Sequence, residues 1–114
     1  MGEINSRKLI DDAVLCFAIG DDNEAKQILV NVLKSEPENL DALRAISEVY
    51  LSLNELEHSE SFCRQALAID SEDLTTVVSL ARILVRKGDK EGAEEASSRA
   101  RILGWKEELG KDNE

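Results

Sequence analysis

Few residues of this chain could do chemistry. One histidine, His58, two cysteines, Cys16 and Cys63, and an acidic run at residues 21–24 are the candidates for a nucleophile, a general base or a metal site. Catalysis and metal binding need several such groups converging on one point. His58 has no cysteine or carboxylate partner at zinc-site spacing, and it stands at the polar start of an expected helix. We interpret it as an exposed surface residue.

The other candidates fail as chemical sites for separate reasons. A calcium-binding EF-hand loop that began at Asp21 would need glycine where Lys26 stands and glutamate where Val32 stands. No glycine-rich phosphate loop or serine nucleophile motif is present. Cys16 and Cys63 lie in apolar stretches and are interpreted as buried, reduced thiols that act as small hydrophobic residues. The sequence therefore predicts a protein that is not an enzyme and has no cofactor or metal.

Composition limits the partners. The chain has 114 residues, 42% of them hydrophobic, which suits one domain over residues 1–114. Its net charge of −10 argues against nucleic-acid and anionic-membrane partners, because proteins bind both through Lys and Arg. No apolar run approaches a membrane span, and no secretory leader is visible. We expect a cytoplasmic protein without membrane insertion. The start MGEINS also fits an N-myristoylation pattern, which chance often produces.

A 34-residue periodicity is the main regularity of the sequence. The stretches that begin at Gly20, Asn54 and Gly88 align with a turn residue first and a small residue five positions later. Upstream of each turn, apolar residues recur three and four positions apart, as on one face of a helix. A single Pro, few aromatic residues and no strand alternation also favour helix. We therefore predict an all-α protein of six helices in three antiparallel hairpins.

The connections support these hairpins. Gly20, Asn54 and Gly88 tolerate the left-handed backbone that ends many helices. Between hairpins, the segments SEPENL and DSEDL offer Ser, Asn and Asp as helix N-caps. Pro37 is expected in the first turn of the helix that follows, where its missing N–H costs nothing.

The period and the placement of small residues resemble the tetratricopeptide repeat, a 34-residue helix hairpin with a skeleton of Trp, Leu-Gly, Tyr, Ala, Phe and Pro. The resemblance covers units 6–39, 40–73 and 74–107, followed by a short polar tail, 108–114. It implies a right-handed superhelical solenoid whose first helices line a concave surface commonly used for peptides. The slots of the skeleton are filled by Leu9, Leu43 and Val77 for Trp, by Ala13, Ser47 and Ala81 for Gly, by Cys16, Tyr50 and Leu84 for Tyr, and by Pro37, Ser71 and Trp105 for Pro.

The departures from that skeleton indicate two polar ends. Asp12 stands in the Leu slot of the first unit, which suits an uncovered N-terminal edge. Ser97 and Arg101 replace large apolar residues of the last helix, so this helix is predicted to cap the solenoid. A capped solenoid should be monomeric, and Trp105 is the first residue to suspect if a dimer forms.

The predicted binding site is the stripe of the first helices that does not pack on the partner helix. Four arginines against three acidic residues give this stripe one positive charge, opposite in sign to the chain as a whole. Exposed apolar residues there suggest a contact surface, and Arg favours carboxylate recognition. The proposed peptide-binding residues are Arg7, Ile10, Val14, Phe17, Arg44, Glu48, Leu51, Val78, Arg82, Val85 and Arg86.

We therefore predict a protein-interaction module, an adaptor or scaffold, that binds a partner's peptide segment in its concave groove. The alternatives are self-assembly through the repeat ends and a secretion-chaperone-like holder of an unfolded client. A further interpretation is that the stripe's apolar residues only pack between first helices and its arginines are solvated. Recognition of a chaperone's C-terminal Glu-Glu-Val-Asp tail is not expected, because the positions that resemble the carboxylate clamp of co-chaperone relatives hold Ile10, Val14, Ala45, Thr75 and Ser79.

Overall fold

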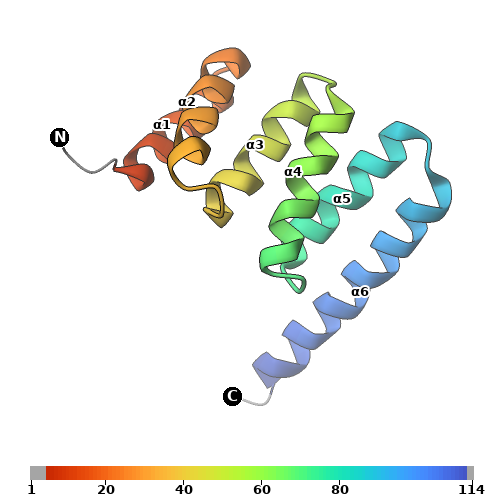
Figure 1. The fold of residues 1–114 in the computed structure, drawn as a ribbon. Helices are drawn as coiled ribbons and strands as arrows, with labels where there is room; N and C mark the ends of the chain where they lie inside the picture. The colour runs from red at the N-terminus through yellow and green to blue at the C-terminus, as the bar shows by residue number, and fades with distance from the viewer. Residues whose placement is uncertain (1–4, 113–114) are drawn as a thin grey trace.

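The structure, a computed structural model, describes residues 5–112, and these residues form six helices and no strand (Figure 1). The N-terminal myristoylation pattern falls mostly on residues 1–4, which lie outside this range. Consecutive helices pair as three antiparallel hairpins, and the predicted all-α repeat solenoid is confirmed. The helices are α1 (Ser6–Ala18), α2 (Asp22–Ser35), α3 (Leu40–Ser52), α4 (Leu56–Ile69), α5 (Leu74–Lys87) and α6 (Lys90–Asp112).

The three hairpin turns share one backbone conformation. Gly20, Asn54 and Gly88 have φ of +89°, +60° and +81°, the left-handed region predicted for them. In each case the next residue donates its N–H to a carbonyl five positions back, for example Asp21 to Cys16 at 2.8 Å and Glu55 to Tyr50 at 2.9 Å. This bond closes the last helical turn, so the turn residue itself fixes where the hairpin reverses.

The first connection between hairpins is N-capped as predicted, whereas Asp73, which precedes α5, makes no side-chain cap hydrogen bond. Pro37 is not in a helix. Asn39 precedes α3, and its Oδ1 accepts from the Ala42 N–H at 3.0 Å. Pro37 lies in the turn before it, where the Asn39 N–H donates to the Glu36 carbonyl at 3.1 Å. The placement of Pro37 in the first helical turn was therefore wrong. Its fixed φ suits the second position of this turn equally well.

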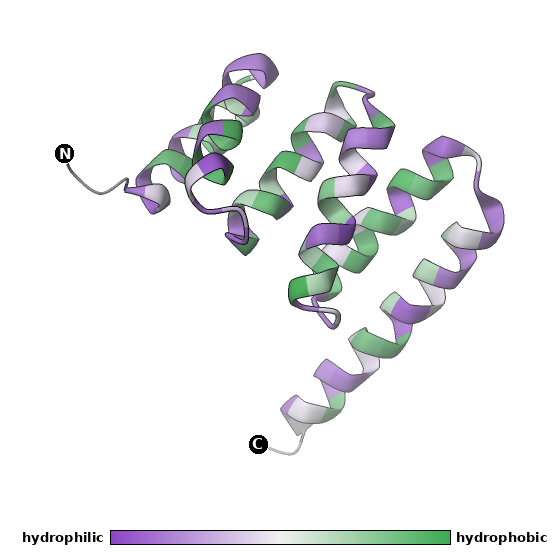
Figure 2. Ribbon diagram, in the orientation of Figure 1, coloured by the Kyte–Doolittle hydropathy of each residue, from purple (hydrophilic) through white to green (hydrophobic). Residues whose placement is uncertain are grey.

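Small residues let the paired helices approach closely. Ala25 and Ser59, which head the second helices of the first two hairpins, are fully buried, and Ala93 is 6% exposed. Ser59 donates its hydroxyl to the Ser47 carbonyl at 2.8 Å, and Ser47 returns a bond to the Ser59 carbonyl at 3.1 Å. A larger residue at either position would push α3 and α4 apart. Figure 2 shows the apolar residues gathered where neighbouring helices face one another.

Burial is weaker at α1. This helix packs on α2 and α3 alone, so Leu9 and Cys16 are only half-buried, and the prediction that both cysteines are buried holds for Cys63 but not for Cys16. Asp12 lies 3.2 Å from the Lys8 ammonium with its side chain 46% exposed, as an uncovered face allows.

The last helix differs most from its prediction. It runs for 23 residues, so the expected tail continues α6 to Asp112 (Figure 1). Trp105 occupies the slot where Pro would end the helix, which explains the extension. The outer side of α6 is also not wholly polar, because Ile102, Trp105 and Leu109 are 53%, 69% and 62% exposed. Within residues 5–112, none of the helices combines the length and the hydropathy needed to cross a membrane.

Candidate functional site: the groove along the first helices

The residues that could do chemistry do not converge. His58 stacks on the Tyr50 ring at 5.0 Å, and its nearest carboxylate oxygen belongs to Glu55, 3.7 Å away. Cys63 donates to the Thr76 carbonyl at 3.4 Å, and burial raises the pKa of its thiol to about 11, which keeps it protonated and unreactive at neutral pH. In the described residues, no three His, Cys, Asp or Glu side chains gather where they could hold a metal ion.

A groove, by contrast, follows the first helices α1, α3 and α5. It consists of three depressions of about 160, 440 and 510 Å³. Glu48 lines the first two, and Val78 and Arg82 line the last two, so the depressions form one continuous row. We call this row the concave groove.

Nine of the predicted binding residues line the concave groove: Val14, Phe17, Arg44, Glu48, Leu51, Val78, Arg82, Val85 and Arg86. Three of them offer apolar surface, since Val14, Val78 and Val85 are 51%, 40% and 66% exposed. Phe17 is half-buried against the core.

Two predicted contact residues belong to the core instead. Ile10 and Leu51 are each 4% exposed, so neither side chain is free to touch a partner. Ile10 packs in the cluster formed by α1, α2 and α3, and Leu51 packs with α4, α5 and α6. The predicted stripe therefore included one buried residue on each of α1 and α3. The reason is that each first helix is covered by the neighbouring hairpin as well as by its own partner helix.

Arg7 and Arg44, near the first end of the groove, are both paired with carboxylates. Arg7 lies 2.6 Å from Asp41, thirty-four residues on. Asp41 also accepts from Arg44 at 2.6 Å, and Arg44 reaches Asp73 at 2.9 Å. The hydrogen bond from Arg44, followed by that from Arg7, lowers the pKa of Asp41. Both cations are therefore paired, although the Arg7 side chain is 65% exposed, and the Arg7–Asp41 pair bridges the first two repeats.

The other end of the groove leaves one cation available. Arg82 lies 2.9 Å from Glu48, which also accepts from the Ser79 hydroxyl at 2.7 Å. Arg86 donates instead to the backbone carbonyl of Leu51 at 3.1 Å and forms no ion pair within the described residues. Its charge remains uncompensated at the edge of the largest of the three depressions.

Sequence reasoning missed several polar residues that line the groove. Ser47, Thr76 and Ser79 line its middle depression, and Ser97 of α6 lines the last one. Ser79 could have been found from the repeat, because it lies 34 residues after Ala45 and so occupies the equivalent position on the next first helix. Nothing in the sequence indicated that α6 would contribute to the groove.

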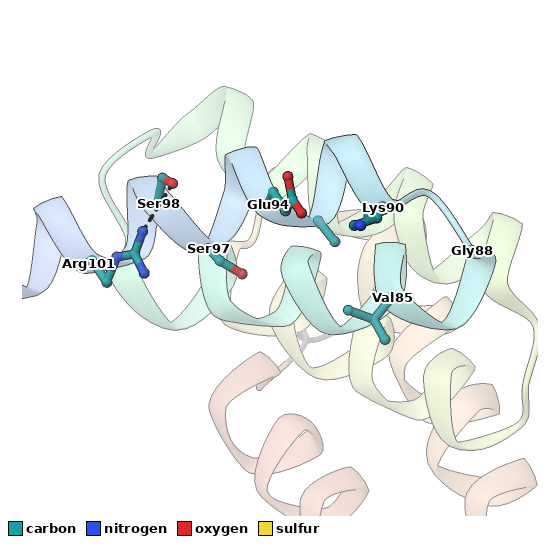
Figure 3. Close-up of a pocket in the computed structure, with 8 residues that line it drawn as sticks. Val85, Gly88, Lys90, Glu94, Ser97, Ser98 and Arg101 are labelled. Atoms are coloured by element: carbon teal, nitrogen blue, oxygen red, sulfur yellow. Dashed lines mark hydrogen bonds between the residues drawn. The ribbon is translucent and has the colours of Figure 1, made fainter.

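A fourth depression, of about 550 Å³, adjoins the groove at Val85 and Ser97. Figure 3 shows it between the end of α5 and α6, with Lys90, Glu94 and Arg101 around it and Arg101 donating to the Ser98 hydroxyl at 3.3 Å. Its lining carries charges of both signs, whereas the lining of the depression at Arg86 contains no carboxylate.

One hairpin of the chain matches a known repeat family directly. Residues 40–73, the hairpin of α3 and α4, match the family described as "Tetratricopeptide repeat". The six helices fit three such units. The α3–α4 hairpin is therefore a tetratricopeptide repeat, and the chain as a whole has the fold of three such units. No curated protein matches the sequence significantly.

Solved structures share the fold at low sequence identity. The second repeat domain of Spaghetti (RPAP3), bound to the HSP90 peptide SRMEEVD, has a TM-score of 0.81 and 16% identity, over 86% of this chain and 91% of that one. The repeat domain of Sgt2 from Aspergillus fumigatus gives 0.83 and 19%, over 90% and 68%. MamA gives 0.83 and 16%, over 87% of this chain and 58% of that one. Identities this low establish the fold alone.

Proposed function

We propose that this protein is a non-enzymatic interaction module that binds an extended, apolar and acidic peptide segment of a partner protein in the concave groove. The observation that carries the proposal is the Arg86 end of the groove. There a depression of about 510 Å³ combines exposed Val78 and Val85 with a cation that no carboxylate neutralises.

The apolar part of the proposal rests on exposure. Val14, Val78 and Val85 stand on helices that could have been polar at those positions, and they line depressions rather than a flat surface. Grooves of this kind are the usual sites where peptide side chains are removed from water. The inter-repeat ion pairs hold the first helices in place, so a peptide would meet a surface that is already ordered.

The acidic part rests on Arg86. A partner carboxylate near Arg82 would have to compete with Glu48, whereas at Arg86 it would replace only a neutral carbonyl. Charge-assisted hydrogen bonds to carboxylates are stronger than neutral ones. We therefore place the acidic residue of the peptide at Arg86.

The peptide recognised should differ from a chaperone tail. The structure found with the HSP90 peptide shares this fold. The clamp positions predicted for this chain, however, include Ile10, which is buried, and Ser79, which is 7% exposed and donates to Glu48. This supports the prediction that the two carboxylates of such a tail find no cationic clamp here. The cytoplasmic location stays a prediction.

The test uses two synthetic peptides with the same apolar residues, one with Asp and Glu and one with Lys at the other positions, titrated by calorimetry at physiological salt. The acidic peptide should bind with a Kd of order micromolar, and the basic one more weakly despite the negative charge of the chain. Arg86→Glu should weaken the acidic peptide about tenfold or more. Lys34→Glu, an equal charge change on exposed α2, is the control. Equal binding by Arg86→Glu and wild type, or a preference for the basic peptide, would overturn the proposal.

A further inference from the structure

The outer face of α6 carries a second apolar surface, separate from the concave groove. Ile102, Trp105 and Leu109 follow one another at intervals of three and four residues, so they share one side of the helix. They are 53%, 69% and 62% exposed. The opposite side carries Ala96 and Leu103, which are buried against α5. We call Ile102, Trp105 and Leu109 the α6 stripe.

The end of α6 has little support from the rest of the protein, its one ion pair being the exposed contact of Lys106 with Glu72 at 3.7 Å within the described residues. Figure 1 shows that it continues past the start of α5, and every residue from Trp105 to Lys111 is exposed. Gly110 lies in this segment, and Gly104 directly precedes it. Two helical turns with glycine in them are marginal in water on their own, because helices gain most of their stability from packing. A partner that covers the stripe would therefore also stabilise the helix.

The spacing of the stripe fits a second helix. Ser98, Ile102, Trp105 and Leu109 alternate four and three residues apart, the seam of a coiled-coil pair. Arg101 and Glu108 flank the seam on one side. Both are exposed, and within the described residues neither forms an ion pair, since Arg101 bonds only to the Ser98 hydroxyl.

Charge complementarity selects the partner and its direction. Consider two antiparallel α6 helices in which Trp105 packs against Ile102 of the second copy. Arg101 then faces Glu108 of the second copy, and the two-fold axis generates the same charge pair a second time. A parallel pair would instead bring Arg101 toward Lys106 of the second copy, a repulsive contact. The cations on the other flank, Arg99 and Lys106, are turned to their own protomer, with Arg99 2.7 Å from the Ser71 carbonyl and Lys106 3.7 Å from Glu72.

We propose that a second copy of this chain covers the α6 stripe, as an antiparallel, two-fold symmetric dimer centred between Ile102 and Trp105. The contact is small, with three large apolar residues from each copy, so the dimer is a weak one, with a dissociation constant on the order of 100 µM. The concave groove stays open on both copies, and two linked grooves would bind a partner with two peptide segments more tightly than one.

The test measures oligomeric state by sedimentation equilibrium from about 10 µM to about 1 mM protein, and the proposal expects monomer at the low end and dimer at the high end. Trp105 is the only tryptophan, so its emission should shift to shorter wavelength over the same range. Arg101→Glu and Glu108→Arg should each weaken the dimer about tenfold, because each turns two attractive contacts into repulsive ones. The double variant restores the pairs and should regain the wild-type dissociation constant to within about threefold.

Lys111→Glu, on the same helix but on the side away from the stripe, is the control and should leave the dimer unchanged. Circular dichroism checks that each variant keeps its helix content. A monomer up to about 1 mM, a dimer indifferent to the charge reversals, or a double variant that stays monomeric would each overturn the proposal. So would a Trp105 emission shift that appears only on adding phosphatidylserine vesicles, since the stripe would then be a lipid-binding surface.

Discussion

The concave groove and the α6 stripe both expose apolar side chains, but they are built in opposite ways. In the groove, Val78 and Val85 stand on a helix packed by its neighbours, and inter-repeat ion pairs such as Arg82 with Glu48 hold the charges around them. On the stripe, Trp105 stands on a segment whose residues are all exposed and whose one ion pair within the described residues joins Lys106 to Glu72.

The difference has a functional consequence. A surface that is already ordered suits a flexible partner, because only the partner loses conformational freedom on binding. An unsupported helix suits a partner that is itself ordered and can support it. Under the two proposals, the same repeat pattern would supply an ordered receptor for a peptide in the concave groove and a surface for a folded partner on α6.

The largest expected effect is on stability, and it compares a buried isoleucine of α3 with an exposed isoleucine of α6. Ile46 of α3 is fully buried under the groove, and Ile102 of α6 is 53% exposed. Ile46→Ala should lower the free energy of unfolding by about 2–5 kcal/mol, because it removes buried methylene groups and leaves a cavity. Ile102→Ala should change it by less than about 0.5 kcal/mol in dilute, monomeric protein. Urea unfolding followed by circular dichroism measures both. Similar losses in the two variants would mean that α6 is packed as tightly as α3.

A smaller effect is expected from overfilling the contact behind the groove. Ala66 of α4 is fully buried, and Ala68, two residues on, is exposed. Ala66→Trp should destabilise the fold by about 1–3 kcal/mol, since the helices around it must move apart. Ala68→Trp makes the same substitution in the same helix and should be close to neutral. Thermal melting of the two variants compares them directly, and a neutral Ala66→Trp would show that the repeat interface is loosely packed.

The smallest effect concerns the pH dependence of stability that comes from the ion pairs at the first end of the groove. The hydrogen bond from Arg44, with that from Arg7, lowers the pKa of Asp41, so this carboxylate stabilises the fold above its unfolded pKa. The contribution is lost as the pH falls through the folded value. Asp41→Asn should therefore be less stable than wild type at pH 7, and the difference should be smaller at pH 3, because the contribution declines as the pH falls below the unfolded pKa toward the lower folded one. Urea titrations at the two pH values test this, and a difference that is undiminished in acid would assign the loss to something other than the ion pairs.

Local patterns carried most of the fold prediction. Turn residues such as Gly88 and small residues such as Ser59 report directly on backbone conformation and helix separation, so the hairpins were visible in the sequence. Pro37 was misplaced because a proline suits both the first turn of a helix and the turn before it. The extension of α6 depended on Trp105 standing in the slot where a proline would have ended the helix.

The groove was predicted less completely. Its apolar residues follow from helical periodicity, but the fate of its charges does not, because Arg7 meets Asp41 only when two repeats stack. The burial of Ile10 and Leu51 likewise depends on a neighbouring unit in addition to their own hairpin. Contacts between units determine which charges stay unpaired, and the sequence of a single repeat does not predict those contacts.

The most direct test of the central claim, that the concave groove binds the peptide, is a methyl NMR titration of valine- and leucine-labelled protein with the acidic, apolar peptide. The account predicts saturable shifts of the Val14, Val78 and Val85 methyl signals, which lie along the groove. The Val30 signals on α2 and the Leu109 signals on α6 should stay in place. Shifts confined to Val30 or Leu109, with the three groove valines unmoved at saturation, would contradict it.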